Sequence, residues 1–365
     1  MPTPLTGCEG DVGMVHGVGR VAAALALVLA PPFAAVGPAK AQQQDLTQLP
    51  PIPQDYQPGK TAWGEPDFRG GWPIDHLNGL PLQRTPEQGN RVFLNDAELA
   101  ERQARLARLA GRYQAEDSSD KLGQGHWVEM GDPTNRTSLL VVPANGRVPA
   151  MTEEGKRRSD LMRSSWRQGQ TFDSPADFDN WDRCITRGLP ASMMPMMYNN
   201  GLRIFQSPGV VVIQMEMIHE ARIIPTDGRP GIPVQIGNWA GESRGHWEDA
   251  NTLVIETTNF RPGASATNIV TSGSPPWNDS PTSDQARLVE RLTMTGPDSI
   301  VYESLWTDPV IFTEPFGTRL DWKRNDGYEF FEYACHEGNV QMRNYINASR
   351  AQRAGKVIPA DSAAN

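Results

Sequence analysis

The sequence predicts a mainly β protein, in which an antiparallel β-barrel follows an α-helical and irregular N-terminal part. From Leu202 onward, short runs rich in β-branched and aromatic residues alternate with turn residues. This pattern is typical of antiparallel sandwiches and barrels. No helical pattern of roughly 10–15 residues separates the runs, which argues against a parallel sheet with crossover helices. We therefore expect the C-terminal half to be the barrel.

Residues 1–41 have the layout of a secretory signal peptide. Arg20 precedes an apolar run that ends near Val36, and Ala39-Lys40-Ala41 forms an A-x-A cleavage site. The apolar run is shorter than the roughly 20 residues that a membrane-spanning helix needs, and two prolines interrupt it. We expect cleavage after Ala41 and a periplasmic or secreted protein. An uncleaved membrane anchor is the alternative.

The part at 63–200 is expected to be α-helical and irregular, and a proline- and glutamine-rich tether at 42–62 precedes it. Asn95 is a helix-capping residue, Glu98 completes a capping box, and leucines recur at helical spacing after them. A short apolar strand is expected in the sequence SLLVV. A second helix should begin near Thr152.

The barrel is assigned to 201–345, and a C-terminal tail to 346–365. Its expected strands are LRIFQ, VVVIQMEMIHEARII, TLVIETTNF, ARLVERLTMT, SIVYESLWTD, TRLDWKR and YEFFEYACH. The segments between them contain Asp-Gly, Pro-Asp and Asp-Ala-Asn sequences that favour turns. Because small closed barrels can hold one ligand, we expect a barrel of lipocalin-like type.

The net charge excludes some classes of binding partner, and the cysteine content predicts a disulfide. The formal net charge of −9 provides no electrostatic basis for binding nucleic acid or anionic lipid. Of the three cysteines, Cys8 lies in the segment to be removed, which leaves Cys184 and Cys335. An even pair in an exported protein favours a disulfide. Two buried free thiols are the alternative.

Several motifs together resemble those of a family of uncharacterised secreted bacterial proteins. They are WGEPDFRGGW at 63–72, YNNGLRIFQSPGVVVIQMEMIHEARIIPTDGRP at 198–230, SRGHWEDANTLVIETTNF at 243–260 and EYACHEGN at 332–339. The resemblance covers nearly all of the mature chain, and one departure, in HWEDANTL, concerns a hairpin turn. The family brings no established activity and no catalytic residues to this chain.

Two His-Glu pairs are candidate acid–base groups. Strand alternation puts His219 on an apolar face and Glu220 on the opposite one, and it divides His336 from Glu337 in the same way. If the barrel closes, His219 and His336 can meet in its lumen, where an apolar setting suits general acid–base chemistry. The alternative for each histidine is a hydrogen-bonded core residue.

We therefore predict a secreted small-molecule enzyme that uses acid–base chemistry, as a lyase, isomerase or hydrolase, without a nucleotide cofactor. The candidates for acid, base or orienting group are His219, His336, Glu337 and Glu216. The candidates for substrate binding are Tyr198, Asn199, Arg222 and Arg244. The alternatives are a non-catalytic lipocalin-like carrier of a hydrophobic ligand and a structural envelope protein.

Zinc is an alternative use of the same histidines, since three histidines and a carboxylate can form a tetrahedral site. The spacing matches no metal signature, because Ile223 stands where H-E-x-x-H needs its second histidine. The stretch GESRG at 241–245 is not interpreted as a G-x-S-x-G nucleophile elbow, and the sequence contains no phosphate-binding glycine loop. It predicts a small-molecule substrate or ligand, no nucleic-acid partner and no membrane span, and it leaves the oligomeric state open.

Overall fold

The structure is a computed structural model, and it describes residues 45–119, 123–167, 169–267 and 280–356. They belong to one compact unit that begins at Asp45. The predicted signal peptide, the first residues of the tether and the end of the predicted tail lie outside the described residues. Among the helices in the described ranges, none is long and apolar enough to cross a membrane.

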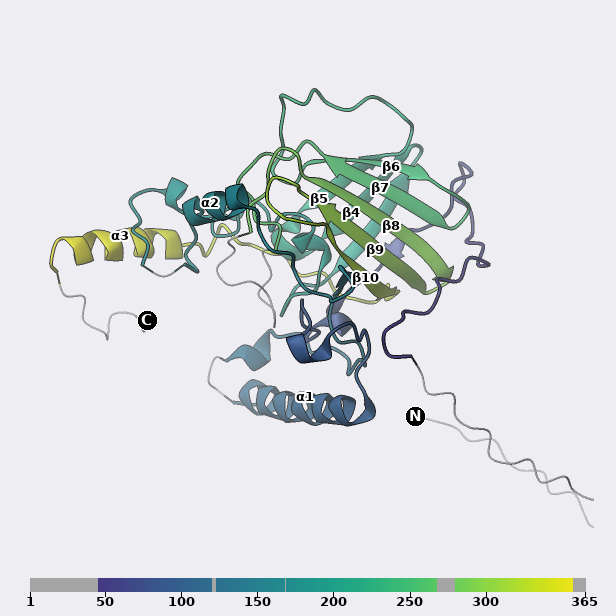
Figure 1. The fold of residues 1–365 in the computed structure, drawn as a ribbon, viewed down its shortest axis with the longest axis horizontal. Helices are drawn as coiled ribbons and strands as arrows, with labels where there is room; N and C mark the ends of the chain where they lie inside the picture. Colours follow the sequence, from purple (N-terminus) through teal and green to yellow (C-terminus); the bar gives the residue numbers. More distant parts are fainter. Residues whose placement is uncertain (1–44, 120–122, 168, 268–279, 357–365) are drawn as a thin grey trace, which may run out of the picture. The chain divides into compact units, whose positions relative to one another are not determined.

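Two antiparallel sheets contain the described strands (Figure 1). The smaller sheet has the order β1-β3-β4-β5, and the larger has the order β2-β10-β9-β8-β7-β6. In chain order the strands are β1 (Gly70–Gly71), β2 (Leu140–Val142), β3 (Leu202–Ser207), β4 (Val210–Met215), β5 (Ala221–Pro225), β6 (Glu242–Trp247), β7 (Thr252–Thr258), β8 (Arg287–Gly296), β9 (Ser299–Thr307) and β10 (Phe316–Lys323). The mainly β prediction is confirmed. The described strands form two separate sheets, so the closed lipocalin-like barrel is not confirmed.

Both predicted helices are present. Helix α1 (Asp96–Asp117) begins after Asn95, whose side chain accepts a hydrogen bond from the Glu98 amide while Glu98 accepts one from the Asn95 amide. Helix α2 (Glu153–Leu161) begins after Thr152, which caps it. Short 3₁₀ turns lie at Asp75–Leu77, Pro86–Gln88, Gln124–His126, Pro175–Asp177, Ala191–Met193 and Met217–His219.

One hydrophobic core joins the two sheets. Trp306 and Trp322 of the larger sheet and Trp72, next to β1, are fully buried in it. Between the sheets, Arg222 of β5 donates hydrogen bonds to Glu290 of β8. Aromatic side chains and an ion pair therefore occupy the space in which the sequence predicted a ligand-holding lumen.

The run VVVIQMEMIHEARII forms two strands, and the prediction of a single strand was wrong. A turn reverses the chain between β4 and β5, with positive φ angles of 57° at Ile218 and 43° at His219. The reversal breaks the alternation, so Arg222 is buried and Ile223 is 67% exposed. The predicted position of His219 on a buried apolar face was also wrong, because its side chain is exposed at this turn.

The aromatic run YEFFEYACH is not a strand, which corrects the second such prediction. Two of its backbone groups bond to side chains instead: the Phe331 amide donates to Glu216, and the Tyr333 carbonyl oxygen lies 3.1 Å from the His219 ring. A turn follows at 335–338. After this turn the chain forms helix α3 (Gln341–Arg353), where the sequence predicted the end of the barrel and a tail.

Cys184 and Cys335 are joined by a disulfide, which confirms the predicted pair. Their Cα atoms are 5.8 Å apart, although 151 residues separate them in the chain. Phe172 and Phe178 pack edge-on against Tyr345 of α3. The disulfide and these aromatic contacts attach the C-terminal helix to the segment between α2 and β3.

Candidate functional site

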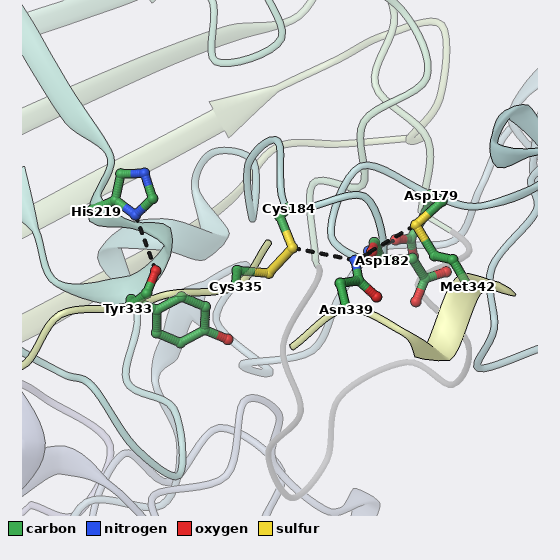
Figure 2. Close-up of a disulfide and its surroundings, with 8 residues drawn as sticks. All are labelled: Asp179, Asp182, Cys184, His219, Tyr333, Cys335, Asn339 and Met342. Carbon is green, nitrogen blue, oxygen red and sulfur yellow. Dashed lines mark hydrogen bonds between the residues drawn. A yellow bond between two sulfur atoms is a disulfide. The ribbon is translucent and has the colours of Figure 1, made fainter. Parts of the chain in front are cut away.

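A pocket of about 460 Å³ lies beside the disulfide. Its described walls come from loops and from the start of α3, and they contain no residue of the ten strands. Its aromatic residues are Trp166, Phe178, Trp181, Tyr198 and Tyr333. Its polar residues are Ser165, Asp182, Glu332, Asn339 and Gln341. Figure 2 shows the disulfide together with Asp182, Tyr333 and Asn339 of these walls.

Asp182 is a carboxyl group of this pocket that its neighbours hold in place. The backbone amide and the hydroxyl of Ser165 both donate to its carboxylate oxygens. Its own amide donates to the side chain of Asp179 at 2.7 Å. Burial raises the pKa of Asp182, and the negative charge of Asp179 raises it further. Asp182 is therefore better suited than an ordinary aspartate to carry a proton towards neutral pH.

Tyr198 and Tyr333 contribute two phenol rings to the same pocket. Their ring centres are 6.3 Å apart, and the angle between the ring planes is 6°. Trp127 packs edge-on against Tyr198 at 5.1 Å. Burial raises the pKa of Tyr333, and the neighbouring Tyr198, to which it is hydrogen-bonded, raises it further. Tyr333 is therefore a neutral hydrogen-bonding group at physiological pH.

A second polar cluster joins Glu129, Glu216 and Tyr328. The Tyr328 hydroxyl lies 3.0 Å from Oε1 of Glu129 and 2.8 Å from Oε2 of Glu216. A phenol has one hydrogen and can donate it to only one of these carboxyls. The other contact is favourable when that carboxyl carries a proton and donates it to the phenol oxygen. The contact of Tyr328 with Glu129 is therefore favourable when Glu129 carries a proton and the phenol donates to Glu216.

Asn199 and Asn200 position the two glutamates. Glu129 accepts hydrogen bonds from the backbone amide of Asn199 and from the side-chain amide of Asn200, both at 2.7 Å. Glu216 accepts one from the Asn199 side chain at 2.8 Å and one from the Gly201 amide at 3.1 Å. Burial raises the pKa of Glu129, and the charge of Glu216 adds to this effect. We therefore place the proton of the cluster on Glu129.

This cluster supports two walls of the pocket. Asn199 directly follows Tyr198, and the Phe331 amide that donates to Glu216 lies two residues before Tyr333. Glu216 is almost completely buried, at 2% exposure. Its carboxylate therefore accepts hydrogen bonds from both segments in the interior of the protein. The cluster fixes where both phenol rings are presented.

The predicted catalytic histidines are exposed and do not belong to the described walls of the pocket. The Nδ1 atom of His219 lies 3.1 Å from the carbonyl oxygen of Tyr333 (Figure 2). His336 and Glu337 are exposed in the turn that follows Cys335. Because the described strands do not close into a barrel, the lumen in which His219 and His336 were expected to meet is not formed by them.

The two predicted substrate-binding arginines have partners within the protein. The side chain of Arg222 is 3% exposed and is paired with Glu290, so it has almost no surface to offer a substrate. This burial contradicts its expected role. Arg244 donates to Glu242 on its own strand and to the carbonyl oxygen of Arg229. Neither arginine is among the residues that line the pocket.

The structure brings together three of the predicted residues and several that sequence reasoning missed. Tyr198 lines the pocket, and Asn199 and Glu216 belong to the cluster that supports it. The missed residues are Glu129, Asp182, Tyr328 and Tyr333. A signal for two of them existed, because Asp182 and Tyr333 each lie two residues before a cysteine of the predicted disulfide. The pairing of the cysteines implies that these two neighbours are also close.

The described part of the chain contains no group of three His, Cys, Asp or Glu side chains arranged to hold a metal ion. Comparisons with family models, with curated proteins and with solved structures give no match for this chain. The resemblance to the secreted bacterial family thus stays a prediction. The chemistry of the site must be argued from its own geometry.

Replacement of Glu129 by Gln should make the stability less dependent on pH. Because the pKa of Glu129 is raised in the folded protein, the folded state keeps a proton that the unfolded chain has lost. The stability that this proton contributes is complete below the ordinary pKa of glutamate and is lost as pH rises through the raised pKa. We expect the free energy of unfolding of E129Q, measured with urea from about pH 4 to pH 8, to increase relative to that of the wild type as pH rises. Parallel stability curves for the two proteins would contradict the assignment of the proton to Glu129.

Proposed function

We propose that this protein is a secreted or periplasmic small-molecule enzyme that uses acid–base chemistry in the pocket beside the Cys184–Cys335 disulfide. The observation that carries the proposal is the position of Asp182. Its carboxyl group is held by Ser165 and lines a pocket of about 460 Å³ together with the phenols Tyr198 and Tyr333. A proton donor or acceptor and two polarising hydroxyls thus share one cavity of small-molecule size.

Asp182 acts as the general acid or base. A carboxyl with a raised pKa is matched to proton transfer near neutral pH, where an ordinary aspartate is too weak a base. The two hydrogen bonds from Ser165 restrict its orientation, which reduces the cost of aligning it with a substrate. The catalytic role that the sequence assigned to His219 and His336 is therefore transferred to an aspartate.

The phenols supply the polar contacts to the substrate. Tyr333 is a neutral donor, and Tyr198 lies parallel to it in the same pocket. A phenol O–H directed at a carbonyl or ether oxygen stabilises the negative charge that develops there during proton transfer. Asn199 and Glu216 are positioning residues, because they hold the backbone beside these two rings.

The reaction class follows from this set of groups. One carboxyl that transfers a proton, assisted by hydroxyls that stabilise developing charge, supports the elementary step of cofactor-independent lyases, isomerases and hydrolases. The proposed location rests on the predicted signal peptide and on the disulfide, which is typical of oxidising compartments.

A non-catalytic carrier is the second candidate, and the aromatic walls of the pocket favour it. The sequence suggested a lipocalin-like carrier with its ligand inside the barrel. In this alternative the ligand instead occupies the pocket beside the disulfide, because side chains fill the space between the sheets. A carrier would release its ligand unchanged, and this outcome separates it from an enzyme.

Asp182→Asn should abolish turnover of the substrate while the protein stays folded. We expect a loss of roughly 10²–10⁴-fold in kcat/KM, the usual contribution of a general acid or base. The substrate is sought by incubating the mature protein with a panel that includes esters, glycosides and β-hydroxy carbonyl compounds, and detecting products by mass spectrometry.

Asp177→Asn is the matched control for this variant. Asp177 also accepts hydrogen bonds from backbone amides, those of Asp173 and Ser174, but it is not among the residues that line the pocket. We expect the control to keep its activity. Wild-type turnover by Asp182→Asn would refute the proposed role, and binding of a ligand that is always recovered unchanged would favour the carrier.

A further inference from the structure

The described walls of the pocket carry negative charge and aromatic faces. Asp182 and Glu332 are its two carboxyl groups, and none of the described lining residues is Lys, Arg or His. The whole chain is acidic as well, with a formal net charge of −9. An anionic ligand would therefore meet unfavourable charge in the pocket and during its approach, whereas a cation would be attracted.

A buried cation, Arg187, also lies near the pocket. Arg187 is close enough to Tyr198 and Tyr333 to interact with both phenols. It is buried at 3% exposure, and its guanidinium donates to the carbonyl oxygens of Met194 and Pro195. Arg187 is not a lining residue, so the surface that a ligand would touch is formed by aromatic and acidic groups.

The hydrogen-bond donors of the walls are largely engaged with other protein groups. The Ser165 hydroxyl donates to Asp182, and one of the two phenol hydroxyls donates to the other, which leaves one phenol hydroxyl able to donate to a ligand. The Asn339 amide donates to the carbonyl oxygen of Asp182 at 2.8 Å and contacts the disulfide sulfur of Cys184 at 3.4 Å (Figure 2). A sugar or another polyol needs several available donors at fixed positions. An organic cation needs only aromatic faces and a nearby carboxylate.

We propose that this pocket takes a small organic cation, a quaternary ammonium or protonated amine that packs against Trp166, Trp181 and the two tyrosines and faces Glu332. This inference rests on the proposed function and names the substrate class of the same site. The charged group is attracted to the negative faces of the aromatic rings. Trp166 is 43% exposed, so part of its ring is open to solvent at the pocket.

The substrate class also affects Asp182. A positive charge within a few ångströms stabilises the ionised form of a carboxyl group. A bound cation therefore opposes the increase in the pKa of Asp182 that burial and the neighbouring Asp179 cause, and it favours the ionised form that can accept a proton.

The proposal is tested by calorimetric titration of the mature protein with four probes. Choline carries a quaternary ammonium, 3,3-dimethylbutan-1-ol has the same shape without charge, 3,3-dimethylbutanoate carries a negative charge, and methyl β-glucoside is a neutral polyol. We expect choline to bind at least about tenfold more tightly than each of the other three. Equal binding of the neutral alcohol, tighter binding of the glucoside or the anion, or no binding of choline would overturn the proposed class.

Two variants locate the binding. Trp166→Leu and Glu332→Gln should each weaken choline binding several-fold and leave the affinity for the neutral alcohol unchanged. Glu329→Gln is the matched control, since Glu329 is an exposed carboxylate on the same segment but not a lining residue. Equal losses in Glu332→Gln and Glu329→Gln would show a general effect of net charge and overturn the placement.

The outcomes separate this inference from the proposed function. If choline binds as expected but Asp182→Asn retains turnover, the cation site stands and the role of Asp182 falls. If Asp182 is required for turnover of a neutral substrate and choline does not bind, the proposed function stands and the substrate class is wrong.

Discussion

Glu290→Gln should lower the free energy of unfolding by about 3–5 kcal/mol, since it removes one partner of a buried ion pair. Arg222 and Glu290 are 3% and 0% exposed, and they connect β5 of the smaller sheet to β8 of the larger. Ser243 and Thr257 accept further hydrogen bonds from Arg222, and Tyr302 donates to Glu290. A neutral glutamine leaves the guanidinium charge in the core without compensation. Urea unfolding measures the loss.

A surface pair provides the control for this prediction. Arg287 of β8 and Glu256 of β7 also form an ion pair between two strands, but their side chains are 51% and 46% exposed. Glu256→Gln should cost less than about 1 kcal/mol, because water and salt screen the pair. Equal losses in Glu290→Gln and Glu256→Gln would contradict the account of a buried charge.

Removal of both charges tests the physical reason. Arg222→Met combined with Glu290→Leu and Tyr302→Phe replaces the ion pair and its phenol partner by apolar groups. This triple variant should recover most of the stability that Glu290→Gln loses, since no buried charge or hydroxyl is left without a partner. Ser243 and Thr257 remain bonded to each other at 2.8 Å.

Cys184→Ala combined with Cys335→Ala should lower the stability by about 5 kcal/mol according to the chain-entropy model of disulfides. The two cysteines are 151 residues apart, so the bond greatly restricts the unfolded chain. Because Cys335 lines the pocket, the variant should also lose affinity for choline. Urea unfolding and calorimetric titration measure the two effects.

Reduction of the wild type is the control for the cysteine variant. A reducing agent should lower the stability of the wild type to that of the double variant and should leave the variant unchanged. Non-reducing peptide mapping of exported protein should show one crosslinked peptide that contains both residues. Recovery of Cys184 and Cys335 as free thiols would refute the disulfide and, with it, the expected effects of its removal on stability and on choline affinity.

The elements that local sequence signals describe were predicted correctly. Asn95 and Glu98 form their capping box before α1, and Thr152 caps α2. These structures depend on residues three or four positions apart, so the sequence contains all the information needed for them. The short strands from β7 to β10 were predictable for a related reason, since their residue types suit a pleated, half-buried surface.

The error at 216–219 has a specific physical cause. Ile218 adopts a φ of 57°, a conformation that a β-branched side chain rarely takes. No residue preference indicates a reversal at this position. The surrounding contacts impose it, because Glu216 is held by Asn199, Gly201 and Tyr328. The prediction of side-chain faces after the turn failed as a consequence.

The sequence by itself determined the β-rich class and the two capped helices, because both depend on residue types and on spacings of a few residues. It also determined the pairing of Cys184 with Cys335, because only these two cysteines remain once the predicted signal peptide is removed. Only the tertiary structure decided which groups form the site. Tyr328 reaches Glu129 across 199 residues, and Tyr333 reaches Tyr198 only after the aromatic run leaves the sheet. Contacts of this kind depend on how distant segments pack and on which buried polar groups need partners. For this reason the chemistry that we propose involves an aspartate and two tyrosines that the fold brings together, and not the two histidines that local patterns made conspicuous.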